Sequence, residues 1–429
     1  MPANDAERGA MDTRCGSSSR TGHVARLSLR HFISYALLSY FEKALIFGFP
    51  LFALYVTGSK AAYNQVEYTF ALAAVLALFL DGGLRIYLLQ AYRVGSQSQE
   101  LIRQIISSFR FLLRIYLIVA ALLFVAVLIF VPNEIFDIGG AAARALFLCM
   151  MAVLAVWYRI KDVPERAFAY SIPVYLLGGA IIWLTAWLEL YGILLALILP
   201  HLAVVIFIAF PRDGEDTTGG ENVERLFIYA KASLRYGWPV LVSIVVTMLM
   251  ANFGKIYAYK NLSENEMFQF SLAQRMALVI QLMHVSITGY MSKHLFVSES
   301  RSFHIKALAA YLGCLLLTSA AVIAFVYLAP GFGLNKVPKI DRTFMFIFAY
   351  MLVWCVGAYA EIYVNRQNRN VIILQAALVS AALFTACLIF GSEDMLLRIA
   401  MSMFLGVSGY LLYILFGSLY LDQRRKSAV

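Results

Sequence analysis

The sequence predicts an all-α protein that crosses a membrane many times, and three observations lead to this fold class. Hydrophobic residues make up 62% of the 429 positions, whereas charged residues make up only 14%. The mean hydropathy of +0.76 is far above the range of soluble domains of this length. Apolar stretches of about 18–25 residues recur along the chain, and each is long enough to cross a bilayer as an α-helix.

Reading each apolar stretch as one span gives about twelve transmembrane helices joined by short connections. The expected spans are residues 32–56, 66–91, 110–132, 139–160, 165–187, 190–211, 234–257, 265–290, 305–328, 341–364, 369–391 and 394–420.

The longest internal connection lies at the midpoint and divides these spans into two six-helix halves. It carries the acidic run Asp213-Gly214-Glu215-Asp216, which is typical of a flexible linker. The expected segments are a disordered tail (1–31), an N-terminal bundle (32–211), a cytoplasmic linker (212–233), a C-terminal bundle (234–420) and a second tail (421–429). The stretches Tyr68-Thr-Phe-Ala-Leu-Ala73 and Phe268-Gln-Phe-Ser-Leu-Ala273 open spans two and eight, which favours parallel halves.

The distribution of Lys and Arg predicts the orientation in the membrane. Roughly 23 of the 35 basic residues fall in the N-terminal tail, in every second loop and at Arg424-Arg425-Lys426. Both termini are therefore expected in the cytoplasm, as in a protein of the bacterial inner membrane. The net charge of +10 follows mostly from this bias, and its spread over many loops argues against a nucleic-acid partner.

Arg275 is the deepest cation, near the middle of the eighth span, where a guanidinium costs roughly 2.5–3.5 kcal/mol. Its own helix offers no acid within one turn, so its counter-ion must come from another span or from a ligand. Gln274 and Gln281 lie around it on a polar stripe of the same helix, and His284 lies beside that stripe. Such a stripe is typical of a helix face that lines a cavity, and the alternative is hydrogen bonding between helices.

The first two spans carry two further charged pairs. Asp81 and Arg85 lie one turn apart on one face of a helix, so they form either an internal salt bridge or a pair that a ligand opens. Glu42 and Lys43 are adjacent, so their side chains diverge by about 100° and we expect Lys43 to face the ligand. The alternative is that both pair with neighbouring helices.

The remaining intramembrane polar residues are expected to be structural. Arg114, Arg144 and Glu361 lie nearer span ends, where their side chains can reach the interface. His201 is interpreted as a hydrogen-bonded core histidine rather than a proton relay.

The residue pattern predicts a transporter rather than an enzyme. The chain carries no phosphate-binding glycine loop, metal-ligand cluster or nucleophile elbow, so we expect no cofactor and no metal. The deep cations Lys43, Arg85 and Arg275 outnumber the deep anions Glu42 and Asp81. An anionic cargo is therefore favoured, and phosphate suits a guanidinium well.

Two regions of the chain resemble Wzx-type O-antigen and polysaccharide flippases of the MATE-like superfamily. The first runs from Tyr35 to Tyr92 and includes Gly58-Ser59-Lys60 and Leu80-Asp81-Gly82-Gly83-Leu84. The second is Leu234-Arg235-Tyr236-Gly237-Trp238-Pro239, followed by the stretch at Phe268. The layout of residues 30–420 is also similar, with two parallel halves joined after the sixth span.

This resemblance implies that the protein moves undecaprenyl-pyrophosphate-linked oligosaccharide between membrane leaflets by alternating access. It further implies that spans one, two, seven and eight line a central cavity, in which Lys43, Arg85 and Arg275 bind the substrate. Glu42 and Asp81 are the candidates for coupling to an ion or for salt bridges. The expected partners are the lipid-linked oligosaccharide, the bilayer, a polysaccharide polymerase and a chain-length regulator.

Three other functions fit the composition less well. An O-antigen polymerase usually carries a large periplasmic loop, and the loops on that side are short here. A cation-coupled drug exporter of the same superfamily calls for an acidic cavity, against the cationic excess. A membrane scaffold would not call for deep charges at all.

Overall fold

The computed structural model shows a bundle of long helices, with no strand among the residues it describes. Those residues are 29–93, 98–130, 135–188, 190–210, 261–298, 300–332, 338–367 and 369–427, together with separate residues between 228 and 259. Within this part of the chain, eleven helices are long and apolar enough to cross a membrane. The all-α polytopic fold class is confirmed.

The N-terminal half contains α1 (Leu29–Thr57), α2 (Lys60–Asp81), α3 (Leu84–Arg93), α4 (Ser98–Phe130), α5 (Ile135–Ile160), α6 (Phe168–Leu184) and α7 (Leu190–Ala209). The C-terminal half contains α9 (Glu264–Val297), α10 (Arg301–Leu328), α11 (Arg342–Arg366), α12 (Asn370–Phe390) and α13 (Met395–Ser427). Most of the expected linker and half of the expected seventh span, residues 234–257, lie outside the described residues.

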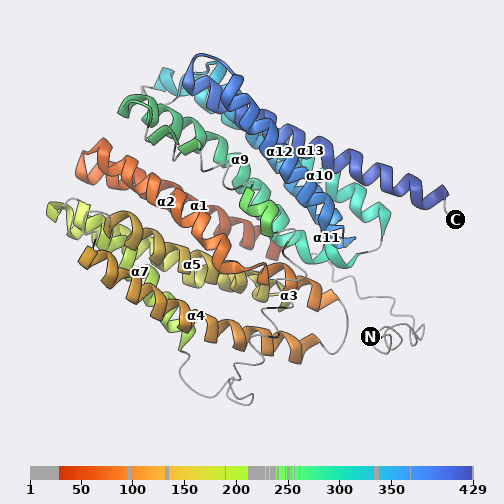
Figure 1. Cartoon of the computed structure of the whole chain (residues 1–429), viewed down its shortest axis with the longest axis horizontal. Helices are drawn as coiled ribbons and strands as arrows, with labels where there is room; N and C mark the ends of the chain where they lie inside the picture. Colours follow the sequence, from red (N-terminus) through yellow and green to blue (C-terminus); the bar gives the residue numbers. More distant parts are fainter. Residues whose placement is uncertain are drawn as a thin grey trace, which may run out of the picture.

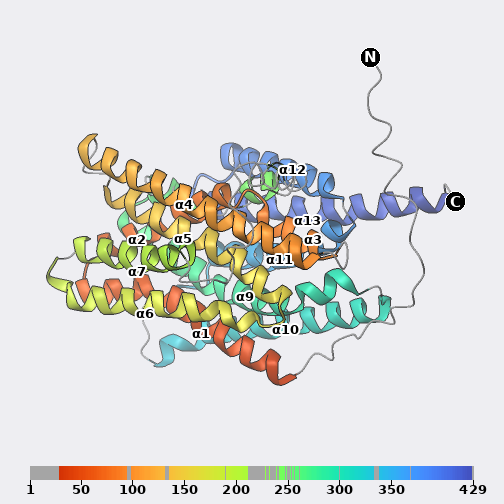
Figure 2. The ribbon, with the colours of Figure 1, turned by 90° about the horizontal axis from the view of Figure 1, so that it is seen from below.

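The helices run side by side along the long axis and form two groups (Figures 1 and 2). Each group has its own apolar core. One cluster of buried residues extends from Phe49 to Ala209 in the N-terminal half, and another extends from Ala258 to Val407 in the C-terminal half. Helix α9 lies beside α1 and α2 and contacts both, so it forms much of the boundary between the halves (Figure 1).

The second span differs from the expected continuous helix over residues 66–91. Helix α2 begins at Lys60, where the Ser59 hydroxyl accepts a hydrogen bond from the backbone N–H of Ala62 at 3.2 Å. It ends at Asp81, because Gly82 and Gly83 adopt φ angles of 55° and 78°. Residues without a Cβ adopt such left-handed angles readily, so the glycine pair separates α2 from α3.

The expected tails are shorter than the sequence pattern indicates. Helix α1 begins at Leu29, and α13 continues to Ser427 through the stretch expected to be a C-terminal tail at 421–429. The last turns of α13 are polar. A hydropathy pattern detects only the apolar span and not a polar continuation of the same helix. The prediction of disorder for residues 1–28 falls outside the described part of the chain.

Candidate functional site

Arg275 lies buried at the boundary between the halves, with only 3% of its surface exposed. From α9 it reaches both α1 and α2 of the N-terminal half. Its Nε donates to the hydroxyl of Tyr63 at 3.1 Å, and its Nη1 donates to the backbone carbonyl of Phe47. Its guanidinium also forms an ion pair with Glu67. The expected counter-ion from another span is therefore confirmed, and it comes from α2.

Glu67 binds two cations of the C-terminal half. Besides Arg275, it accepts a hydrogen bond from Lys255 Nζ at 3.1 Å, and the Glu67 side chain is only 2% exposed. One carboxylate thus faces two positive groups, which leaves an excess positive charge in a poorly solvated place. A buried carboxylate bound by two cations is also difficult to separate from them, because removing one partner leaves an uncompensated charge.

Sequence reasoning missed Glu67 as a site residue. The expected second span began at residue 66, so this glutamate stood at the predicted membrane boundary, where an acid is unremarkable. The structure extends the helix back to Lys60 and places Glu67 inside the bundle. The polar run Asn64-Gln65-Val66-Glu67 was a useful signal, because it precedes the apolar stretch within the same helix.

Polar contacts near the α1–α2 turn surround this network. Lys60 Nζ donates to the Asn265 amide oxygen at 2.9 Å, and the Tyr259 hydroxyl donates to Gln65 Oε1 at 2.8 Å. The ring of Tyr259 also stacks on Tyr68, with centroids 5.0 Å apart. At this end, α2 is therefore joined to the C-terminal half mainly through hydrogen bonds, ion pairs and aromatic contacts.

A second junction between the halves lies further along α1 and α9. The hydroxyls of Ser39 and Ser286 are 2.9 Å apart and hydrogen-bonded, and both side chains are buried. The rings of Tyr35 and Tyr290 lie beside each other with centroids 6.0 Å apart. The two halves consequently touch along much of the length of α1.

Glu42 and Lys43 pair with each other rather than diverging. Lys43 Nζ lies 2.9 Å from Glu42 Oε2, and the Lys43 and Glu42 side chains are 26% and 9% exposed. The expectation that these adjacent residues point apart is wrong, because two long side chains can bend across the 100° between their helix positions. Lys43 lies one turn before Phe47 on α1, and the Phe47 carbonyl accepts a hydrogen bond from Arg275.

Asp81 and Arg85 form the expected salt bridge, with 3.0 Å between Asp81 Oδ2 and Arg85 Nε. Asp81 Oδ1 also accepts a hydrogen bond from the Arg85 backbone N–H at 3.4 Å. This pair does not join the Arg275 network, because Asp81 lies about 20 Å beyond Glu67 along α2 at 1.5 Å per residue. The binding of one ligand by Lys43, Arg85 and Arg275 together stays a prediction, and Arg85 enters it from the far end of α2.

The polar stripe on α9 turns mostly into its own half. Gln274 Nε2 donates to Met403 Sδ of α13 at 3.8 Å, and His284 Nδ1 is 2.7 Å from the Tyr311 hydroxyl of α10. Both contacts are hydrogen bonds between helices, which is the alternative that the sequence left open, and the cavity-lining role of these residues stays a prediction. Gln281, which is half-buried, is the member of the predicted set that keeps partial exposure.

Arg144 was expected to reach the membrane interface, and this is also wrong. Its side chain lies inside the N-terminal half, where the residue is 4% exposed. Its guanidinium carbon stands 3.4 Å from the centre of the Phe70 ring, and Nη1 donates to the Tyr175 hydroxyl at 3.1 Å. A desolvated cation over an aromatic face gains roughly 2 kcal/mol, which offsets part of the cost of burying the charge.

The described part of the chain holds no metal-ligand cluster and four free cysteines. No group of three or more His, Cys, Asp or Glu side chains there is placed to hold a metal ion. Cys149, Cys314, Cys355 and Cys387 are free thiols, and Cys15 lies outside the described residues.

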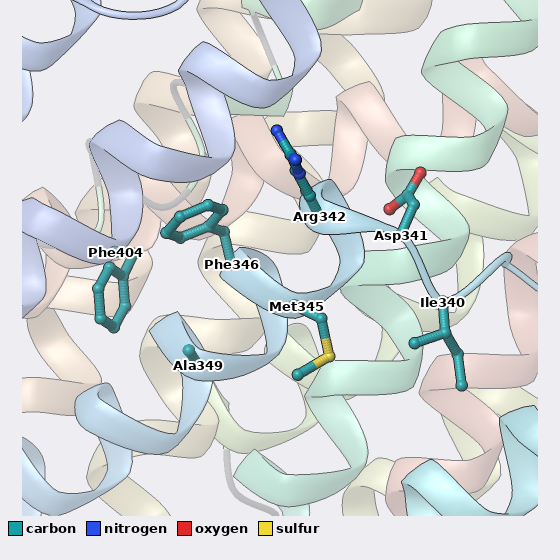
Figure 3. A pocket seen from close by; sticks show the side chains of 7 residues that line it. All are labelled: Ile340, Asp341, Arg342, Met345, Phe346, Ala349 and Phe404. Atoms are coloured by element: carbon teal, nitrogen blue, oxygen red, sulfur yellow. The ribbon is translucent and has the colours of Figure 1, made fainter.

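A separate pocket lies at the beginning of α11, in a later part of the sequence than Arg275. It has a volume of about 590 Å³ and lies between α11 and α13 (Figure 3). Its lining residues are Ile340, Asp341, Arg342, Met345, Phe346, Ala349 and Phe404. Asp341 already caps α11 by accepting from the backbone N–H of Phe344 at 2.7 Å. Apart from Asp341 and Arg342, the wall is apolar.

Comparison with known proteins identifies the fold. No protein-family model matches the chain. No curated protein matches it either. Solved structures of MATE proteins do match over almost the whole chain. A MATE protein in complex with MaL6 is 15% identical with a TM-score of 0.62, and the match covers 92% of this chain and 97% of that one.

Both inward-facing and outward-facing relatives match about equally well. An inward-facing MATE family multidrug resistance transporter of the MOP superfamily has a TM-score of 0.63 at 14% identity, covering 93% of this chain and 99% of that one. An outward-facing one has a TM-score of 0.61 at 15% identity, covering 92% and 96%. The MATE multidrug transporter DinF-BH has a TM-score of 0.64 at 12% identity, again covering 92% and 96%. This chain is thus a multi-pass membrane protein with the MATE fold.

Proposed function

We propose that the protein is a flippase that moves an oligosaccharide linked to undecaprenyl pyrophosphate across the bacterial inner membrane by alternating access. The observation that carries this proposal is the buried network in which Arg275 and Lys255 share the single carboxylate of Glu67. The network joins the two halves of a fold whose solved examples are transporters.

The chemistry of the network suits a diphosphate. Its two cations are a guanidinium, which binds phosphate oxygens through two parallel hydrogen bonds, and an ammonium, which acts as a point charge. A diphosphate carries more negative charge than the Glu67 carboxylate, so it can replace that carboxylate without leaving either cation unpaired. Lys43, one turn from Phe47 on α1, supplies a third cation within the same region.

In the transport cycle, the substrate headgroup and Glu67 alternate as the partners of Arg275 and Lys255. In a state open to the cytoplasm, the headgroup enters between the halves and binds Arg275 and Lys255. The lipid tail stays in the bilayer, beside the opening between the halves. Rocking of the halves moves the opening to the other side and releases the headgroup there, after which Glu67 binds both cations again. Both chain termini lie in the cytoplasm in this scheme, and a polymerase and a chain-length regulator act on the product.

A cation-coupled drug exporter is the second candidate, because the matched structures include multidrug transporters. In that case Glu67, Glu42 and Asp81 are the acids that bind the coupling cation. The structures named above are transporters rather than enzymes, so the polymerase alternative gains nothing from them.

A deletion strain distinguishes these candidates. Loss of surface polysaccharide, with complete units accumulating on the lipid carrier in the inner leaflet, is the expected result. Core carrying a single repeat unit would assign the chain to polymerisation instead. Unchanged polysaccharide together with increased sensitivity to cationic drugs would assign it to drug export.

Complementation then tests the network itself. Arg275→Ala should fail to restore polysaccharide, although it reaches the membrane in normal amount. The matched control is Arg114→Ala on α4, whose arginine donates to the Ala209 carbonyl at 2.9 Å within the N-terminal half. Full restoration by Arg275→Ala would show that the cargo does not depend on this guanidinium.

A further inference from the structure

The N-terminal half encloses a cation with no acidic partner. Among the residues that the structure describes, no carboxylate lies within ion-pair distance of Arg144, which is 4% exposed. One of its nitrogens donates to Tyr175, while its Nε is buried and has no hydrogen-bond partner in the same part of the chain. A guanidinium in an apolar bundle needs a counter-charge or hydrogen-bond acceptors, so this group is incomplete by itself.

His201 of α7 lies beside Arg144 and is also incomplete. The residue is 1% exposed, and neither of its ring nitrogens has a hydrogen-bond partner of normal geometry among the described residues, although the Leu197 carbonyl lies nearby. Its ring packs edge-on against Phe147 and Tyr175, with centroids 4.9 and 5.8 Å away. Tyr175 therefore touches both groups within the same helical half.

We propose that Arg144 and His201 form a binding site for a small monovalent inorganic anion such as chloride, inside the N-terminal half. The Arg144 Nε–H and one imidazole N–H of His201 donate to the anion, and both groups are buried without a hydrogen-bond partner among the described residues. A neutral imidazole has one N–H to give, and its tautomer is set by the anion.

The surroundings select a small, weakly hydrated anion. The Phe70 ring lies under the Arg144 guanidinium, and the rings of Phe147 and Tyr175 pack against His201, so the surroundings of both donors are largely aromatic. A phosphate group would need several more donors to replace its water, and these walls do not supply them. A single negative charge balances the single guanidinium.

The anion site is independent of the proposed cargo, but it shares a helix with the Arg275 network. Phe70, which lies under the Arg144 guanidinium, follows Glu67 by three residues on α2. Neighbours at this spacing lie on adjacent parts of a helix surface. The anion site therefore lies beside the helix that carries Glu67.

Binding of radioactive chloride to the purified full-length chain tests this site. We expect saturable binding of one chloride per chain, displaced by bromide and nitrate and unaffected by gluconate. Arg144→Met should lose the saturable component, whereas the matched variant Arg114→Met should keep it. His201→Phe, which keeps the aromatic contacts, should weaken binding at least severalfold.

Three outcomes would overturn the proposal. The first is absence of saturable chloride binding to the unchanged chain, which would mean that water satisfies both groups. The second is equal binding by Arg144→Met, which would place the anion elsewhere. If Arg144→Met does not fold, crystals of the unchanged chain grown in bromide decide. An anomalous peak between Arg144 and His201 supports the site, and its absence there is the third contrary outcome.

Discussion

The guanidinium of Arg275 and the carboxylate of Glu67 form an ion pair that joins two positions 208 residues apart in the sequence. One partner belongs to the C-terminal half and the other to the N-terminal half. Lys255 binds the same carboxylate from the C-terminal half as well. Any movement that separates α2 from α9 must therefore break this pair and give each charge another partner.

Removing the Glu67 charge should destabilise the protein. Glu67→Gln leaves Arg275 and Lys255 buried without a counter-ion, and losing one partner of a buried ion pair costs about 3–5 kcal/mol. We expect a clearly lower thermal midpoint in detergent. The double variant Glu67→Gln with Arg275→Gln should recover part of the loss, because Lys255 is then the one charge of the network without a counter-ion.

Glu266→Gln is the control for this prediction. Glu266 lies on the exposed surface of α9 and closes a capping box with Ser263, a role that glutamine can also perform. Its thermal midpoint should stay close to that of the unchanged chain. Equal midpoints for Glu67→Gln and the unchanged chain would argue against a buried ion pair in the membrane.

Lysine should not replace arginine at position 275. The guanidinium contacts Tyr63, Glu67 and the Phe47 carbonyl in three directions, and an ammonium on a different stem cannot reproduce that set. Losing one charge-assisted hydrogen bond costs about 1.5–3 kcal/mol, so flipping in proteoliposomes should fall roughly tenfold or more. Flipping of labelled lipid-linked oligosaccharide at the normal rate would show that charge alone suffices.

A disulfide between α1 and α9 should lock the halves together. The hydroxyls of Ser39 and Ser286 are hydrogen-bonded at 2.9 Å, so cysteines at both positions lie close enough to bond. In a background without the five native cysteines, Ser39→Cys with Ser286→Cys should form a crosslink on oxidation. We expect transport to stop and to return after reduction, if rocking of the halves drives transport.

The control for this crosslink pairs Ser39→Cys with Ser319→Cys. Ser319 is buried within α10, and its hydroxyl bonds to the Leu315 carbonyl of its own helix. No crosslink should form. Continued transport by the fully crosslinked Ser39–Ser286 variant would contradict a mechanism that separates α1 from α9.

Two glycines with equal free space should respond to alanine in opposite directions. A Cβ added at Gly82 or at Gly313 would meet no atom within 4 Å, but only Gly82 has a positive φ, at 55°. Gly82→Ala should cost about 1–2 kcal/mol of unfolding free energy because of the left-handed backbone. Gly313→Ala, inside α10, should instead gain about 0.5–1 kcal/mol. Denaturant unfolding in mixed micelles measures both, and equal signs would refute the backbone argument.

The number and places of the spans were predictable, because a bilayer imposes a minimum length on each apolar helix. The expected spans at 139–160 and 341–364, for instance, begin and end within a few residues of the ends of α5 and α11. The break at Gly82 and Gly83 was not predicted, because a glycine pair can equally remain inside a transmembrane helix to let another helix approach.

The partners of the charged residues were less predictable. The need for a distant counter-ion at Arg275 followed from its own helix, but its identity depended on which helices become neighbours. Lys43 and Arg144 were misjudged for a related reason. A hydropathy pattern gives depth along a helix, whereas rotation about the helix axis decides whether a side chain meets lipid, a neighbouring helix or a charge.

The separation of the apolar core between the two halves has a consequence for how the molecule can move. Each cluster draws its buried residues from one half only. The contacts that join the halves include Ser39–Ser286, Lys60–Asn265 and Glu67–Arg275, and water can take the place of each partner. Opening the boundary therefore wets polar groups and leaves both cores dry. The free energy of opening should depend on hydration and salt far more than on the packing of either half.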